Sequence, residues 1–274
     1  MTAAAPVTRR LLDVRDLAVA LHLGDRTVTA LDGVDVSVAP GECIGIVGES
    51  GSGKSTFARA VTRLLPNVRS TVTGRAEFEG RDVLRLDDRG LRALRRDRGF
   101  AMIFQDPLGY LNPTQRVGRQ IEEALLRDPG AGRASDRVAH LLDEVGLPDP
   151  AGVARRYPHE LSGGMRQRVM IAIALASAPK LLFADEPTTA LDVTVQLQVL
   201  ATLYRLHRSR AMAMAIITHD LGVIAEMCDR VYVMRFGKVV ESGPTVTLFA
   251  NPQHPYSARL IELSRRRLAP GRPT

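Results

Sequence analysis

Apolar and polar residues alternate along the first forty positions, with the period of two that is typical of half-buried β-strands. The alternation is clearest over residues 12–17 and 34–38, and residues 24–26 have the composition of a turn between such runs. Cys43–Val47 is instead continuously apolar, as expected of a strand buried on both faces of a parallel sheet. The pattern therefore predicts a β-rich beginning that leads into a buried strand.

The middle of the chain has the apolar spacing of amphipathic helices. Val138, Leu141 and Leu142 show this spacing within 117–176, where loops rich in Pro, Gly and Asp separate the helical stretches. We expect a helical subdomain over about 108–178, inserted into an α/β domain that spans 11–250.

Strands and helices alternate again after the helical region. Apolar runs at 181–184, Ala213–Ile217 and 231–234 are typical of buried strands, and the stretches at 193–208 and Leu221–Met227 have helical spacing. Such alternation predicts a mainly parallel sheet.

The charge balance favours an anionic partner. Lys and Arg number 37 against 30 Asp and Glu, which gives a net charge of +7. This excess suits nucleic acid, nucleotide phosphates or an acidic membrane surface, and does not choose among them. Aromatic residues make up only 4% of the chain and Trp is absent, so stacking platforms for single-stranded nucleic acid are scarce.

Cysteine usage and hydropathy favour a soluble, cytoplasmic chain. Cys43 and Cys228 lie far apart in apolar runs, where a small buried side chain is favoured over a disulfide or a metal ligand. No apolar run reaches the roughly 20 residues that span a bilayer. Residues 1–10 lack the apolar segment of a signal peptide.

A glycine-rich loop follows the strand Cys43–Val47 and opens a helix that we predict over 54–65. It fits G-x-x-x-x-G-K-[ST], the pattern of loops that bind nucleotide phosphates. Glycines let backbone N–H groups turn towards phosphate oxygens, the lysine supplies charge for the β- and γ-phosphates, and the serine hydroxyl suits Mg²⁺. The candidate residues are Gly48, Glu49, Ser50, Gly51, Ser52, Gly53, Lys54, Ser55 and Thr56.

Two carboxylates, Asp185 and Glu186, end the apolar run at 181–184. At the carboxyl end of a parallel strand they face the crevice where ligands bind. Asp185 suits the coordination shell of Mg²⁺, and Glu186 suits the orientation or deprotonation of an attacking water. A strand that ends in Asp-Glu is common, but the phosphate loop upstream favours this interpretation.

A second candidate anion site lies inside the helical region. Ser162, Gly163 and Gly164 open a long helix, where a hydroxyl, free N–H groups and the helix dipole converge. An ordinary helix cap would explain the serine alone. The position of the run, between the phosphate loop and the Asp-Glu strand, favours the anion site.

In this order the motifs resemble those of the nucleotide-binding subunits of ABC transporters, over nearly the whole chain from about 11 to 256. The resemblance implies a P-loop NTPase (RecA-like) core with a mainly parallel sheet, an N-terminal antiparallel β-subdomain and the inserted helical subdomain. It also implies a head-to-tail pair of ATP-binding subunits. In such a pair, the phosphate loop of one subunit and the Ser-Gly-Gly signature of the other enclose each ATP with its Mg²⁺.

The resemblance also assigns roles to individual residues. Gln105 matches the glutamine that senses Mg²⁺ and the permease, and His219 matches the switch histidine near the γ-phosphate. Ala190, Leu191 and Asp192 match the D-loop, of which Asp192 is a nucleotide-site residue. The implied catalytic residues are Gln105, Glu186 and His219, and the implied Mg²⁺ ligands are Ser55, Gln105 and Asp185.

One position departs from the family pattern. The family stacks adenine on an aromatic side chain near the start of the domain, and the corresponding residue here is Leu21, with His22 beside it. Either adenine packs on aliphatic surface or His22 replaces the aromatic ring.

Further motifs resemble the branch that imports oligopeptides, dipeptides or nickel. They are Phe104-Gln105-Asp106-Pro107-Leu108, Leu111-Asn112-Pro113, Tyr157-Pro158-His159-Glu160 and Asn251-Pro252-Gln253-His254-Pro255-Tyr256. The extension 251–274 is short and lacks a cysteine cluster, so we expect no iron–sulfur centre. Its Arg-, Pro- and Gly-rich end predicts a frayed tail.

The sequence therefore predicts an ATP-hydrolysing subunit that powers import of peptides or nickel at the cytoplasmic face of the cell membrane. The expected partners are a second ATP-binding subunit, two transmembrane permease subunits and, indirectly, an extracellular solute-binding protein, with no nucleic acid. The alternatives are a soluble ABC-type ATPase that acts on nucleic acid, or the ATPase of an exporter.

Overall fold

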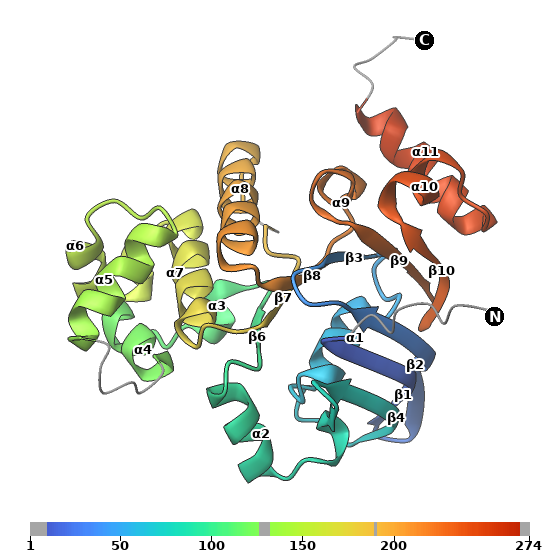
Figure 1. Cartoon of the computed structure of the whole chain (residues 1–274), viewed down its shortest axis with the longest axis horizontal. Helices are drawn as coiled ribbons and strands as arrows, with labels where there is room; N and C mark the ends of the chain where they lie inside the picture. Colours follow the sequence, from blue (N-terminus) through green and yellow to red (C-terminus); the bar gives the residue numbers. More distant parts are fainter. Residues whose placement is uncertain (1–9, 126–131, 189–190, 269–274) are drawn as a thin grey trace, which may run out of the picture. The chain divides into compact units, whose positions relative to one another are not determined.

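The computed structural model of the chain describes residues 10–125, 132–188 and 191–268 (Figure 1). They form two compact units. One contains the chain up to Leu86 together with Asp220 onward, and the other is Asp87–His219.

The first unit holds most of the β-structure. Its elements before residue 87 are β1 (Leu12–Leu23), β2 (Arg26–Val38), β3 (Cys43–Val47), α1 (Lys54–Val61), β4 (Ser70–Phe78), β5 (Arg81–Asp82) and the 3₁₀ turn η1 (Val83–Arg85). Those after residue 219 are α9 (Leu221–Met227), β9 (Arg230–Arg235), β10 (Lys238–Pro244), α10 (Thr245–Ala250) and α11 (Pro255–Leu268).

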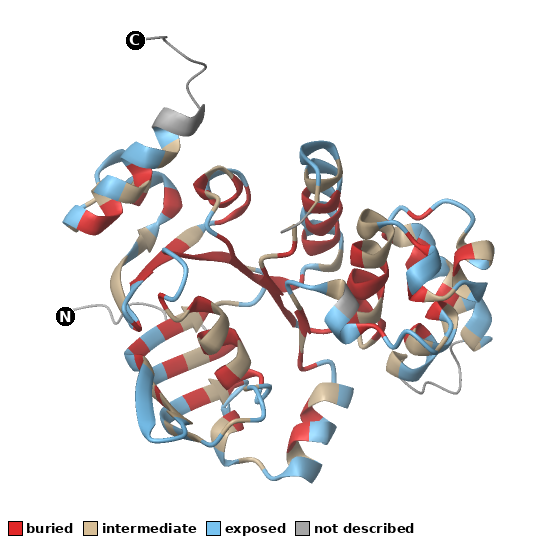
Figure 2. Cartoon of the chain, turned by 180° about the vertical axis from the view of Figure 1, so that it is seen from behind, coloured by how far each residue is buried: buried red, intermediate tan, exposed pale blue. Residues whose placement is uncertain are grey.

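An antiparallel sheet forms the N-terminal part of this unit. Its strand order is β2-β1-β4-β5. Leu12, Val14 and Leu17 of β1 are buried, and Figure 2 shows the alternation of buried and more exposed residues along these strands. The pattern of apolar residues thus predicted the buried face.

A second group of strands has β9 between β3 and β10. Strand β9 runs parallel to β3 and antiparallel to β10.

The second unit combines three parallel strands with most of the helices. Its elements are α2 (Asp88–Arg96), β6 (Phe100–Ile103), α3 (Pro107–Tyr110), α4 (Val117–Ala124), α5 (Ala134–Glu144), α6 (Pro150–Arg155), the 3₁₀ turn η2 (Pro158–Glu160), α7 (Gly163–Ala176), β7 (Leu181–Asp185), α8 (Val193–Arg210) and β8 (Ala213–Ile217). The subdomain boundary at about 108–178 stays a prediction.

The core of the second unit contains buried residues of both its strands and its helices. All five residues of β7 and of β8 are buried, as expected of strands covered on both faces. Ile121, Leu142 and Ile171 of the helices are fully buried, and each such side chain contributes about 1.5–3 kcal/mol to folding. Because β6, β7 and β8 run parallel, their carboxyl ends meet at one edge.

Two predicted segments differ from the structure. Helix α1 ends at Val61 rather than at residue 65, because Arg63 adopts a left-handed backbone with φ of 55°. The prediction of a frayed tail after Pro252 was wrong over 255–268, which form α11, and residues 269–274 lie outside the described residues. Tyr256 and Ile261 are buried there, and their apolar contacts outweigh the polar composition of the segment.

Candidate functional site

The phosphate loop lies between β3 and α1 in the first unit. Gly51 and Gly53 have φ of 78° and 102°, a left-handed region that favours glycine. A Cβ on Gly53 would lie 2.7 Å from the carbonyl oxygen of Ala30, whereas a Cβ on Gly51 would meet open space. The loop therefore needs glycine at residue 53 for both conformation and room, and at residue 51 for conformation.

Lys54 is the first residue of α1 and folds back over the loop. It is 5% exposed. Its ammonium donates hydrogen bonds to the carbonyl oxygens of Gly48 and Glu49, at 2.9 and 2.8 Å, and to the hydroxyl of Ser52 at 3.4 Å. A buried cation at the positive end of a helix, beside a glycine-rich turn, is a donor set that fits the phosphates of a nucleotide.

The three predicted catalytic residues lie together in the second unit. The amide Nε2 of Gln105 donates to Oε2 of Glu186 at 3.2 Å, and Nδ1 of His219 lies 3.5 Å from Oε1 of the same carboxylate. They follow β6, β7 and β8, whose shared edge brings them together. One carboxylate is thus held between an amide and an imidazole.

The backbone at Glu186 is unusual for a residue with a side chain. Its φ is 44°, and its N–H donates to the carbonyl oxygen of Ile217 at 2.8 Å. This bond continues the pairing of β7 with β8 beyond Asp185, which is fully buried at the end of β7. Asp185 is therefore buried in this structure, whereas the side chain of the next residue, Glu186, is 18% exposed.

The signature residues and Asp192 open neighbouring helices of the second unit. The hydroxyl of Ser162 accepts from Met165 N at 3.3 Å, and the carboxylate of Asp192 accepts from Val195 N at 3.0 Å. A Cβ on Gly164 would lie 2.5 Å from Cγ1 of Val195. Ser162 and Asp192 are therefore the N-caps of α7 and α8 in this structure. The two helices approach each other closely at Gly164. Ala190 of the predicted D-loop lies outside the described residues.

His22 is held by its neighbours in the antiparallel sheet. Its Nδ1 lies 3.1 Å from Oγ1 of Thr27, and its Nε2 lies 2.9 Å from Oγ1 of Thr71. These contacts orient the ring across β1, β2 and β4. Leu21 pairs with Val28 in β2 and with Ser70 in β4.

One contact to the phosphate loop was not predicted from the sequence. The hydroxyl of Tyr256 accepts a hydrogen bond from Glu49 N at 3.0 Å. In the sequence, only the Pro-rich motif that ends at Tyr256 points to this contact. That motif supports the family resemblance but assigns no role to the tyrosine. A pairing across 207 positions depends on the tertiary fold.

The fold and the phosphate loop place the chain among the P-loop NTPases. A comparison with protein families matches residues 31–189 to the ABC transporter family. The chain belongs to this family.

Curated relatives extend the similarity over most of the chain. It is 50% identical over 257 residues to the peptidoglycan transport ATP-binding protein YejF of Agrobacterium fabrum, covering 93% of this chain but only 47% of that protein. It is 48% identical over 253 residues to the oligopeptide transport ATP-binding protein OppD of Salmonella typhimurium, covering 92% and 75%. The chain thus spans about half the length of the first relative and three quarters of the second.

A solved structure confirms the predicted fold class. The ATP-binding cassette MJ0796, in a dimeric post-hydrolysis state bound to ADP and Pi, superimposes with a TM-score of 0.75 at 27% identity. The match covers 85% of this chain and 98% of that cassette.

In the described part of our chain, no helix has both the length and the apolar character needed to cross a membrane.

Proposed function

We propose that this chain is the ATP-hydrolysing subunit that powers peptide import through an ABC transporter. The observation that carries the proposal is the Glu186 carboxylate, held between Gln105 and His219. The family match and a relative named for oligopeptide transport support it. Nickel as cargo, an exporter and an ATPase acting on nucleic acid remain alternatives that the experiments below address.

The residues divide the chemistry between binding and hydrolysis. The phosphates of ATP bind to the phosphate loop, which consists of Gly48, Glu49, Ser50, Gly51, Ser52, Gly53, Lys54, Ser55 and Thr56. Lys54 offsets the negative charge of these phosphates. Glu186 orients the attacking water and accepts its proton, while His219 and Gln105 hold that carboxylate in place.

The proposed Mg²⁺ ligands form a suitable donor set. Mg²⁺ prefers oxygen ligands. The proposed ligands supply them as the hydroxyl of Ser55, the amide oxygen of Gln105 and the carboxylate of Asp185. Nε2 of Gln105 donates to Glu186, so the amide oxygen is the atom that suits the metal. When bound, Mg²⁺ neutralises charge on the transferring phosphoryl group.

The signature residues complete the site of a partner subunit in this proposal. Ser162, Gly163 and Gly164 present a helix N-terminus to the phosphates bound by the partner, and Asp192 lies beside them at the start of α8. The dimeric state of the MJ0796 cassette supports such pairing. Two permease subunits at the cytoplasmic face of the membrane, and indirectly a solute-binding protein, complete the proposed assembly.

The first test compares ATP hydrolysis by the wild type and Glu186→Gln. Glutamine preserves the shape of the side chain and removes its basicity, so we expect hydrolysis to fall at least about 100-fold while ATP still binds. Glu226→Gln changes an exposed carboxylate on α9 and is the matched control. Equal rates for Glu186→Gln and the wild type would contradict the proposal.

Affinity purification from the native membrane separates the alternative classes. We expect the tagged chain to bring down two membrane proteins and a second ATP-binding subunit. Recovery of DNA or RNA without membrane proteins would instead support the nucleic-acid ATPase.

A further inference from the structure

The C-terminal motif packs against the start of the phosphate loop within the first unit. Tyr256, the second residue of α11, is 6% exposed, and its hydroxyl accepts a hydrogen bond from Glu49 N at 3.0 Å. The guanidinium of Arg235, at the end of β9, lies 4.8 Å from the centre of the tyrosine ring. The ring and the hydroxyl are therefore both held.

The turn before α11 is anchored separately. The carboxylate of Glu241 in β10 accepts hydrogen bonds from Gln253 N at 2.8 Å and from His254 N at 3.0 Å. Nδ1 of His254 in turn accepts from Tyr256 N at 3.1 Å. These bonds determine where α11 begins, and hence where the tyrosine lies.

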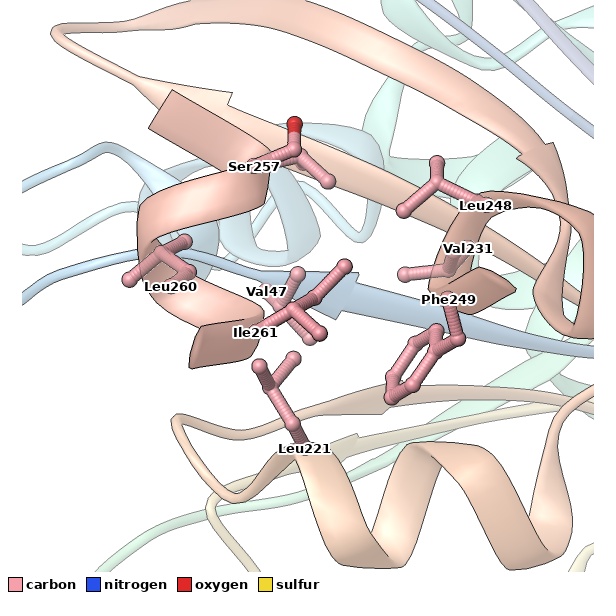
Figure 3. A pocket seen from close by; sticks show the side chains of 9 residues that line it. Val47, Leu221, Val231, Leu248, Phe249, Ser257, Leu260 and Ile261 are labelled. Atoms are coloured by element: carbon pink, nitrogen blue, oxygen red, sulfur yellow. The ribbon is translucent and has the colours of Figure 1, made fainter. Parts of the chain in front are cut away.

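An apolar junction secures the rest of the helix. Figure 3 shows Leu260 and Ile261 of α11 opposite Val47 of β3 and Leu221 of α9. Val47 immediately precedes the phosphate loop. The C-terminal helix therefore packs on the strand that carries the loop, close to the residue that the tyrosine contacts.

One peptide unit links Tyr256 to the lysine of the loop. The N–H of Glu49 and the carbonyl of Gly48 belong to the same peptide. The N–H donates to Tyr256, and the carbonyl accepts from the ammonium of Lys54 at 2.9 Å. Since a peptide is planar, the bond to Tyr256 fixes the direction of the carbonyl that holds the lysine. Bonds in such a chain also polarise one another.

We propose that Tyr256 is a positioning residue for nucleotide binding, which orients the Gly48–Glu49 peptide and through it the ammonium of Lys54. The inference rests on the proposed function as an ATPase. It assigns a role to the motif 251–256, which binds the last helix to the phosphate loop.

Tyr232 provides a closely matched control. It lies in β9 of the same unit and is 4% exposed. Its hydroxyl accepts from Ser37 N at 3.0 Å and donates to Ser37 O at 3.1 Å, and the guanidinium of Arg230 lies 5.3 Å from its ring centre. Tyr232 thus makes the same kinds of contact at a residue outside the phosphate loop.

The experiment measures the steady-state constants for ATP and the melting temperature of the wild type, Tyr256→Phe and Tyr232→Phe in the assembled transporter. Loss of one hydrogen bond to the loop is expected to raise the KM for ATP about three- to tenfold in Tyr256→Phe. Its kcat should stay within about twofold, because Gln105 and His219 hold Glu186 independently. Tyr232→Phe should change only the melting temperature. The dissociation constant of ATP, measured by titration, should follow KM.

A merely structural role gives a different result. If Tyr256→Phe lowers the melting temperature as Tyr232→Phe does but binds ATP like the wild type, the inference is wrong and the ATPase proposal stands. If the wild type neither binds nor hydrolyses ATP, the proposed function fails, and this inference with it.

Discussion

At the scale of single residues, the site depends on backbone conformations as much as on side chains. Gly53 has φ of 102°, and Glu186 has φ of 44° despite its side chain. A non-glycine residue in that region costs about 1–3 kcal/mol and persists only where its surroundings hold it. At Glu186 the bond to Ile217 and the contacts of its carboxylate with Gln105 and His219 supply that support.

The two cysteines are buried, as the sequence predicted, and the structure adds a detail. Both cysteines are free and buried. Their sulfur atoms lie 3.6 Å apart, although 185 positions separate the two residues in the chain. The hydrogen bond to Cys43 and burial raise the pKa of the Cys228 thiol well above its usual value. A buried thiol with a raised pKa reacts slowly, because the thiolate is the nucleophile.

We therefore expect Cys228 to resist alkylation by iodoacetamide at pH 8 in the folded protein and to react fully in denaturant. Mass spectrometry over time measures the modification. Asp25→Cys introduces an exposed reporter thiol in the turn between β1 and β2, and this thiol should react within minutes. Modification of Cys228 at the rate of the reporter would contradict the expected raised pKa.

At the scale of elements, α11 is held to β10 by a carboxylate. Burial alone would raise the pKa of the Glu241 carboxyl. Hydrogen bonds from Gln253 N and His254 N to the carboxylate oxygens outweigh burial and hold this pKa below its usual value. A carboxylate whose pKa is lower in the folded state stabilises the protein above its unfolded pKa of about 4.3, and the stabilisation is lost as the pH falls through the folded value.

The corresponding prediction concerns Glu241→Gln. We expect this variant to melt at a lower temperature than the wild type at pH 7, because the amide accepts weaker hydrogen bonds. The difference should shrink as the pH falls below about 4.3 and through the lower folded pKa, where the wild-type carboxylate becomes protonated. Melting curves from about pH 2.5 to pH 8 measure it, with Glu226→Gln as the exposed control. A difference that does not depend on pH would show that the charge of Glu241 contributes nothing.

Elements also differ in how well the sequence predicts them. Cys43–Val47, Ala213–Ile217 and Leu221–Met227 agree with the predicted ranges to the residue, because each has a clear apolar pattern between turn residues. Helix α11 was not predicted, since its arginines and flanking prolines obscure two buried apolar positions. Helix α2 was also not predicted; only Leu91 and Leu94 are buried in it.

At the scale of the whole molecule, the motifs predicted the fold class and the family because phosphate chemistry requires particular residues at fixed spacing. The structure brings Gln105, Glu186 and His219 together, and the resemblance to the ABC transporter family had assigned all three to one catalytic site. The contact of Tyr256 with Glu49 could not be predicted, because it joins the last helix to a loop near the start of the chain. Local pattern carries no information about such a pairing.

In the proposed function, ATP hydrolysis by this chain drives peptide uptake. The most direct measurement is uptake of a labelled oligopeptide by cells that lack the chain and are supplied with either the wild type or Glu186→Gln at equal abundance. We expect the wild type to restore uptake and Glu186→Gln to leave it at the level of the deletion. Equal uptake with the wild type, the variant and no chain at all would contradict it.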